Sequence, residues 1–194
     1  MRALGLIGVV ALAAGCTVAP RLPPPPDWPA RQAQLLALES WRMTGRVAVV
    51  ADGKGASASL DWRQDGATSD LALRGPFGAG GLRVLLLADS LVIEDGRGGR
   101  LAGVAARSFL AEQLGTELPL SALRYWLLGT PAPGEPASET LGEDGRLAAF
   151  EQSGWQVDLP RYEAFGADVL PVRLTASRGD VRVKLAVGAW EIGS

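Results

Sequence analysis

The sequence contains no histidine, which removes the side chain that proteins use most often as a general base and as a transition-metal ligand. No serine stands in a Gly-x-Ser-x-Gly pattern, and no Gly-Lys-Ser/Thr sequence occurs, so the patterns of a hydrolase nucleophile and of a P-loop are both missing. Lys and Arg number 19 against 21 Asp and Glu, and no basic patch stands out, which argues against nucleic acid as a partner. These absences predict a protein that is not an enzyme and holds no metal or other cofactor in its fold.

Carboxylates are present, but their positions indicate solvated surface rather than acid–base chemistry. Glu139, Glu143, Asp144 and Asp158 lie in expected turns or on the polar phase of expected strands. The tripeptide at 178–180, Arg-Gly-Asp, has the composition of a hairpin turn, and we interpret it as one rather than as an adhesion motif.

Cysteine occurs once, as Cys16, at the end of an apolar run that spans Ala3 to Ala14. The run follows Met1-Arg2 and is too short to cross a membrane, as is typical of a signal peptide. A lone cysteine has two ordinary interpretations, a free thiol or an intermolecular bridge. The residues before it, Leu-Ala-Ala-Gly at 12–15, favour a bacterial lipobox instead, although Ala13 occupies the place where leucine is usual.

We therefore predict that residues 1–15 are a signal peptide that is removed. Cys16 then becomes the first residue and carries a covalent diacylglycerol and an N-acyl chain. Thr17 follows the cysteine, where an aspartate would indicate retention in the inner membrane. The expected location is the outer membrane, with the protein held by its lipid and facing the periplasm.

Residues 16–29 are predicted to form a lipidated, proline-rich tether, because prolines stand at Pro20 and throughout Pro23–Pro26. An extended proline segment of this length would separate the anchor from the rest by roughly 30–40 Å. A recognition peptide for a proline-binding domain is the alternative. Residues 30–194 are long enough for one domain with a hydrophobic core.

Hydrophobic periodicity in that domain changes from helical to alternating and back. Alternating runs separated by Gly, Asp and Ser predict antiparallel hairpins, and two helical runs interrupt them, which indicates the α+β class. A strongly curved antiparallel sheet of this kind becomes an open barrel. The expected helices cover 29–38, 104–114 and 120–128, and the expected strands cover 46–50, 57–63, 71–73, 82–87, 91–94, 146–152, 155–159, 172–177, 181–187 and 189–192.

One loop departs from ordinary loop chemistry. Residues 75–81 carry no charge, and Phe77 stands between Pro76 and Gly78. Loops are normally polar and face solvent. Phe77 either folds back into the core or forms an exposed apolar tip that touches lipid.

Several segments together resemble the LolB family of outer-membrane receptors and insertases for lipoproteins. The similarity is colinear from about Trp41 to Ile192, and the family's closing tryptophan corresponds to Trp190. The segments are Gly75–Gly78, Leu118–Pro131, which contains Leu-Arg-Tyr-Trp-Leu-Leu-Gly-Thr-Pro, Gly154–Val157 and Leu170–Leu174.

The resemblance implies an incomplete, strongly curved antiparallel β-barrel with a helical lid that encloses an apolar cavity. It also implies that Pro76, Phe77 and Gly78 form a membrane-insertion loop, with Phe77 in the place where the family usually has leucine. Candidates for the apolar lining of the cavity are Trp62, Leu73, Leu85 and Ile93, although the period of two in strands leaves their face open.

The implied partners are the periplasmic carrier LolA, acylated lipoprotein cargo and outer-membrane lipid, and we expect a monomer. Each buried CH₂ of an acyl chain contributes about 0.8 kcal/mol, so a triacylated cargo cannot cross water without a carrier. The predicted function is to accept acylated lipoproteins from LolA and insert them into the outer membrane. The alternative is a structural or assembly outer-membrane lipoprotein without a lipid cargo. Neither the docking surface for LolA nor the opening of the helical lid follows from the sequence.

Overall fold

The computed structural model describes residues 22–51, 53–75, 80–87, 90–114 and 117–193. Residues 1–21, which include Cys16, and the loop residues Pro76, Phe77 and Gly78 lie outside the described ranges. The helices are α1 (Trp28–Leu36), α2 (Gly103–Leu114) and α3 (Leu120–Leu128). The strands are β1 (Ser40–Ala51), β2 (Lys54–Asp65), β3 (Thr68–Arg74), β4 (Gly81–Leu87), β5 (Ser90–Asp95), β6 (Arg100–Ala102), β7 (Ala137–Leu141), β8 (Leu147–Gln152), β9 (Trp155–Phe165), β10 (Asp168–Arg178) and β11 (Val181–Ile192).

The eleven strands of the described residues form one antiparallel sheet in the order β6-β5-β4-β3-β2-β1-β11-β10-β9-β8-β7. Two meanders, β1 to β6 and β7 to β11, are joined where the first strand pairs with the last. In the ranges that the structure describes, the edge strands β6 and β7 do not pair with each other, so the sheet stays open. The expected incomplete antiparallel barrel is confirmed.

The junction between the two meanders requires a glycine. A Cβ atom at Gly45 would lie 2.3 Å from the carbonyl oxygen of Ala186 on the paired strand. The register of β1 against β11 shifts between Thr44 and Gly45, as at a β-bulge. Bulges increase local twist and bend a strand, so this position contributes to the curvature of the sheet.

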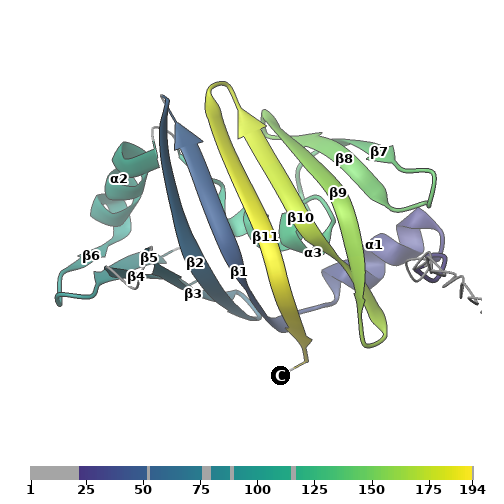
Figure 1. The fold of residues 1–194 in the computed structure, drawn as a ribbon, viewed down its shortest axis with the longest axis horizontal. Coiled ribbons are helices and arrows are strands. Elements are labelled where there is room, and N and C mark those ends of the chain that lie inside the picture. Colours follow the sequence, from purple (N-terminus) through teal and green to yellow (C-terminus); the bar gives the residue numbers. More distant parts are fainter. Residues whose placement is uncertain (1–21, 52, 76–79, 88–89, 115–116, 194) are drawn as a thin grey trace, which may run out of the picture.

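The helices lie on the same side of the bent sheet, with α2 at one end of the molecule and α1 and α3 toward the other (Figure 1). Trp41 fills the middle of the core, where its ring contacts Trp62 and Trp190 at centroid distances of 5.6 and 5.2 Å. All three side chains are buried. The core therefore lies between the concave face of the sheet and the helices.

Two strands were missed by the sequence prediction, and both are edges. All three residues of the short β6 are exposed, and most of β7 is exposed and polar, so neither shows the alternation of a half-buried strand. The expected strands 181–187 and 189–192 form the single strand β11.

Candidate lipid-binding interior

A row of apolar side chains crosses the concave face over four strands. Trp62 pairs with Leu71, Leu71 with Val84, and Val84 with Ile93. All four side chains belong to the buried core. The structure thus brings the candidates Trp62 and Ile93 together on the inner face.

The other two candidates are placed differently. Leu73 pairs with Leu60 and packs, half-buried, against the same core. Leu85 pairs with Asp70 and Val92 and alternates with Val84, so it faces the opposite side of the sheet. The assignment of Leu85 to the inner face is therefore wrong, and the cause is the one-residue ambiguity of a run of three leucines.

Helix α3 is firmly packed over one part of the concave face. It buries Leu123, Trp126, Leu127 and Leu128. The Trp126 ring lies edge-on to Phe150 at 5.9 Å, and its indole N–H donates to the side-chain oxygen of Gln152 at 2.8 Å. A polar group inside a core needs such a partner, so this hydrogen bond fixes the helix as well as the ring.

Helix α2 packs more loosely over β5 and β6. Among the α2 side chains that the structure describes, Ala106 alone is buried, while Phe109 and Leu110 are half-buried against the core. Val104 at the start of the helix is 80% exposed. The helix covers the sheet without sealing it.

A cavity of about 300 Å³ lies between α2, the start of α3 and the β4–β5 hairpin. Its apolar lining includes Leu86, Leu91, Leu110 and Leu118, and its charged residues are Arg107 and Glu117. None of the four sequence candidates lines it. Leu86 was missed because one residue of register separates it from Leu85, and nothing in the local pattern distinguishes the two.

A second cavity of about 260 Å³ lies near the β2–β3 turn, between the end of α1 and α3. Leu38, Trp41 and Leu128 form apolar parts of its lining. Its polar lining includes Gln64 and Arg124, and the Arg124 guanidinium donates to the carbonyl oxygen of Gly66 at 2.6 Å. The cavities are therefore separate, and the one beside α2 is the larger.

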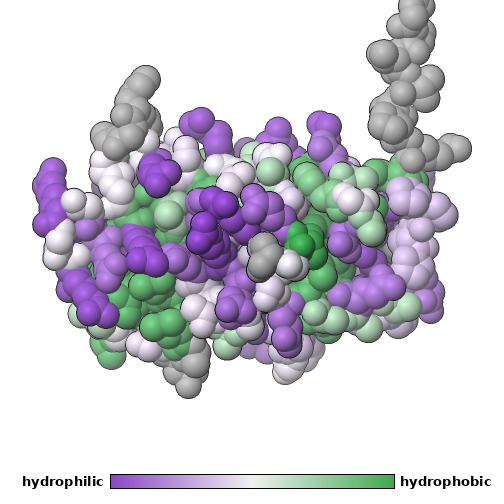
Figure 2. Space-filling model, turned by 90° about the horizontal axis from the view of Figure 1, so that it is seen from below, coloured by the Kyte–Doolittle hydropathy of each residue, from purple (hydrophilic) through white to green (hydrophobic). Residues whose placement is uncertain are grey.

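Figure 2 shows the face seen from below, where apolar side chains form separate patches among polar ones. The large apolar residues that are exposed are scattered over different elements and include Val50, Leu87, Leu101, Val104 and Leu141.

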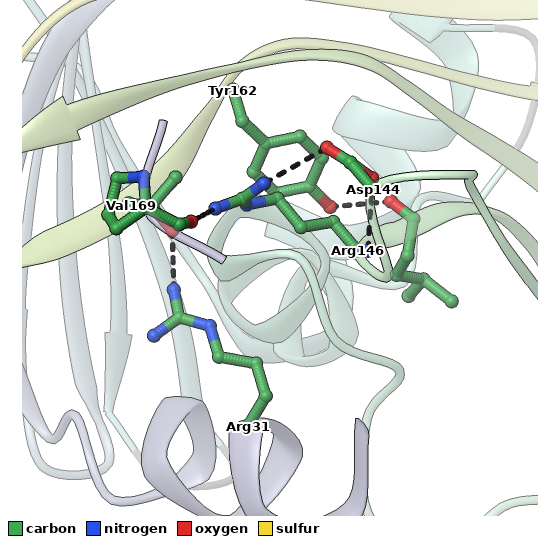
Figure 3. Close-up of polar contacts among 7 residues, drawn as sticks. Arg31, Asp144, Arg146, Tyr162 and Val169 are labelled. Carbon is green, nitrogen blue, oxygen red and sulfur yellow. Dashed lines mark hydrogen bonds and ion pairs between the residues drawn. The ribbon is translucent and has the colours of Figure 1, made fainter. Parts of the chain in front are cut away.

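A polar cluster lies at the other end of the sheet, beside α1 (Figure 3). The Arg146 guanidinium donates to the Asp144 carboxylate at 3.1 Å and to the carbonyl oxygen of Pro23. Burial acts to raise the pKa of Asp144, but the hydrogen bonds from the Arg146 backbone and guanidinium, with its charge, outweigh burial and hold this pKa below its usual range. Burial raises the pKa of the Tyr162 hydroxyl, which donates to the carbonyl oxygen of Leu147 at 2.6 Å.

Within the described ranges, no group of three or more Asp, Glu, His or Cys side chains is placed to hold a metal ion. None of the helices that the structure describes is long and apolar enough to cross a membrane. Glu139, one of the carboxylates considered above, accepts hydrogen bonds from Trp28 and Gln32 of α1. That carboxylate therefore has a structural partner on a helix.

The chain thus folds into an open, curved antiparallel sheet with helices across an apolar concave face. Two solved structures are similar to it: a LolA superfamily protein from Nitrosomonas europaea (TM-score 0.53, 9% identity, 85% of this chain and 91% of that one) and a DUF1329 family protein from Desulfovibrio piger (TM-score 0.55, 8% identity, 84% and 90%). At these identities the likeness shows the fold alone.

The sequence comparisons are more specific. The family model described as Outer membrane lipoprotein LolB matches residues 39–190. Proteins named Outer-membrane lipoprotein LolB are 36% identical in Pseudomonas putida F1 (86% of this chain, 82% of that one), 33% in Ectopseudomonas mendocina (98% and 97%) and 36% in Halorhodospira halophila (79% and 76%).

The chain belongs to the LolB family. It is an outer-membrane lipoprotein receptor of the lipoprotein localisation pathway, and it is not an enzyme. Family and fold together imply interaction with LolA and with lipoprotein cargo.

Proposed function

We propose that this receptor takes the acyl chains of its cargo into the space beneath α2 and delivers them to the outer membrane through the loop that contains Pro76, Phe77 and Gly78. The anchor would be the lipid on Cys16, at the end of the tether 16–29. The acting unit would be a monomer that meets LolA, acylated cargo and outer-membrane lipid, with no other cofactor and no nucleic acid.

The observation that carries this proposal is the cavity beside the loosely packed helix α2. Its volume of about 300 Å³ is at the lower end of the range for small-molecule sites, roughly 300–1,000 Å³. A cargo with several acyl chains needs more apolar space, so α2 must move outward to admit it. Among the α2 side chains that the structure describes only Ala106 is buried, which supports such a movement at modest cost in free energy.

The alternative, an outer-membrane lipoprotein without lipid cargo, makes a different prediction for the soluble Cys16→Ala form. A carrier should bind a hydrophobic dye and release it to an acylated peptide. A purely structural lipoprotein should show no displacement by that peptide.

The insertion step is tested by Phe77→Glu. Burying a phenylalanine side chain contributes roughly 1.5–3 kcal/mol, enough to bias the loop toward the bilayer and too little to anchor the domain. A carboxylate resists the lipid interface, so we expect normal transfer from loaded LolA to the variant and loss of transfer from the variant into liposomes.

The control is Phe77→Leu, which should deliver cargo almost as well as the original chain. Circular dichroism shows whether Phe77→Glu is folded. An unfolded variant would mean that Phe77 belongs to the core, and normal transfer in both steps would mean that the loop has no role in insertion.

A further inference from the structure

The segment that precedes α1 is held against the domain by a buried arginine. The Arg146 side chain is only 7% exposed, and one of its terminal nitrogens donates to the carbonyl oxygen of Pro23 (Figure 3). The other donates to Asp144 at 3.1 Å. A buried guanidinium that loses an acceptor is destabilised, so the Pro23 carbonyl is part of the structure around Arg146.

A proline ring of the same segment also packs against the domain. A Cβ atom at Gly145 would lie 3.4 Å from Cγ of Pro25, an ordinary van der Waals distance, so the Pro25 ring lies close to the Gly145 backbone. Gly145 also has a φ of 77°, which glycine adopts readily. Proline segments are stiff and extended, and their carbonyl groups are free to accept hydrogen bonds. Asp144, Gly145 and Arg146 therefore form a surface suited to a proline segment, which we name the tether dock.

Helix α1, which follows the proline segment, is also attached to the sheet by hydrogen bonds. Arg31 donates to the carbonyl oxygen of Val169 on β10, and Trp28 and Gln32 donate to Glu139 on β7. From Pro23 to Gln32 the chain is thus fixed to the β7–β10 end of the sheet. Only the part of the predicted tether before Pro23 remains to serve as a spacer.

We propose that the tether dock holds the lipidated N-terminal segment so that the anchor leaves the domain at the β7–β10 end, and that this places the domain lengthwise along the bilayer. The proposal rests on the lipidation of Cys16 and the insertion loop set out above. Residues 17–22, between the predicted anchor and Pro23, can span about 20 Å at roughly 3.1 Å per residue. That reach is about half of the span expected for a fully free tether.

The 75–80 loop, at the opposite end of the molecule, is the proposed second point of contact with the membrane. Gly75 donates its backbone N–H to the carbonyl oxygen of Gly80, and Gly96 donates to that of Gly81, so the two ends of the 75–80 loop lie beside the β5–β6 turn. Along the longest axis of the molecule, β4–β6 and α1 lie at opposite ends (Figure 1). With a short spacer at one end, the loop at the other end reaches the same membrane only if that axis lies along the surface.

The docking itself is tested in the soluble mature chain with Cys16→Ser. Spin labels on Pro24→Cys and Asp180→Cys, both exposed positions, report the distance between the segment and the β10–β11 turn. We expect a narrow distance distribution that broadens in Arg146→Gln and stays narrow in Arg161→Gln. Arg161 is a matched control, because it is 63% exposed and paired with Glu163.

A broad distribution in the parent chain, or a narrow one in Arg146→Gln, overturns the proposal. If Arg146→Gln does not fold, a chain with Pro23→Gly, Pro25→Gly and Pro26→Gly, and with the label kept on Pro24→Cys, retains Arg146 and removes the stiff segment. That chain should show the broad distribution, and a narrow one would equally overturn the proposal.

Orientation is tested in the lipidated chain on phosphatidylethanolamine–phosphatidylglycerol vesicles that contain a quencher lipid. A fluorophore on Arg97→Cys, in the exposed β5–β6 turn, should be quenched, and Arg146→Gln should reduce this quenching several-fold. If the chain does not bind vesicles at all, the proposed anchor fails, and the spin-label distances still decide the docking. If the chain binds and quenching is the same in both variants, the anchor stands and the lengthwise orientation is wrong.

Discussion

The two helices that cover the concave face differ in how they are held. Helix α3, over the β8–β10 part of the sheet, buries four large side chains and joins its tryptophan to Gln152 by a hydrogen bond. Helix α2, over β5 and β6, buries Ala106 and leaves Val104 exposed to 80%. The same face of one sheet thus has a fixed cover at the α3 end and a loose cover at the α2 end.

The difference suggests that the α3 end mainly stabilises the fold, whereas the α2 end is the part that admits cargo. The rings of Trp126, Phe150 and Trp155 interlock beneath α3 and contribute to the free energy of folding there. The larger cavity lies beside α2, where Leu110 is half-buried. A carrier must admit cargo and release it, so a firm support beside a movable cover suits the function better than uniform packing.

The largest effect expected from this comparison is that of Trp126→Ala. The change removes a fully buried ring and leaves the Gln152 side chain without one of its partners, which should lower the free energy of unfolding by about 3–5 kcal/mol. Urea unfolding measures this loss. Phe109→Ala in the half-buried part of α2 is the control and should cost less than about 2 kcal/mol. Equal losses would mean that the two ends do not differ.

Much of the fold could be predicted from local sequence. Ser153 and Gly154 both have positive φ, as a two-residue hairpin requires, and the strands on either side were predicted from that turn. Helix α3 was predicted with its observed limits, since Pro119 precedes it and Gly129 ends it with a φ of 88°. These features are encoded within a few residues.

The parts that escaped prediction depend on distant contacts. Strand β7 is polar because it is an edge, yet its Glu139 accepts hydrogen bonds from α1 more than a hundred positions earlier in the sequence. Pro23 and Arg146 are 123 positions apart. The cavity likewise arises where α2 meets the β4–β5 hairpin. No local sequence pattern encodes these long-range contacts. For this reason Leu86 was missed as a cavity-lining residue and Leu85 was chosen instead.

A smaller effect is expected from filling the cavity at the α2 end. Leu110→Trp places a larger ring in the space of about 300 Å³, where the loose packing of α2 should limit the cost in stability to about 1–3 kcal/mol. Binding of an acylated peptide to the soluble chain, measured by dye displacement, should weaken several-fold. Leu87→Trp, on a side chain that is 45% exposed, is the control and should leave binding unchanged. Unchanged binding in Leu110→Trp would place the acyl chains elsewhere.

The smallest expected effect is the dependence of stability on pH. Its size should be similar at the two ends of the molecule. Hydrogen bonds from the backbone N–H groups of Gly99 and Arg97 lower the pKa of Asp95 at the α2 end, and the contacts with Arg146 described above lower the pKa of Asp144 at the opposite end, beside α1. A carboxyl group with a lowered folded pKa stabilises the fold above its unfolded pKa, and this stabilisation is lost as the pH falls through the folded value.

Both carboxyl groups are accessible to solvent, so each contribution is small. The chain has no histidine, so no side chain with an ordinary pKa titrates between about pH 5 and 8. The urea midpoint should therefore be constant from about pH 8 to 5.5 and should fall only below about pH 4. Asp95→Asn and Asp144→Asn should each reduce the acid-induced fall slightly. A midpoint that already falls between pH 8 and 5.5 would contradict this account, because it requires a group whose pKa in the fold differs strongly from its ordinary value.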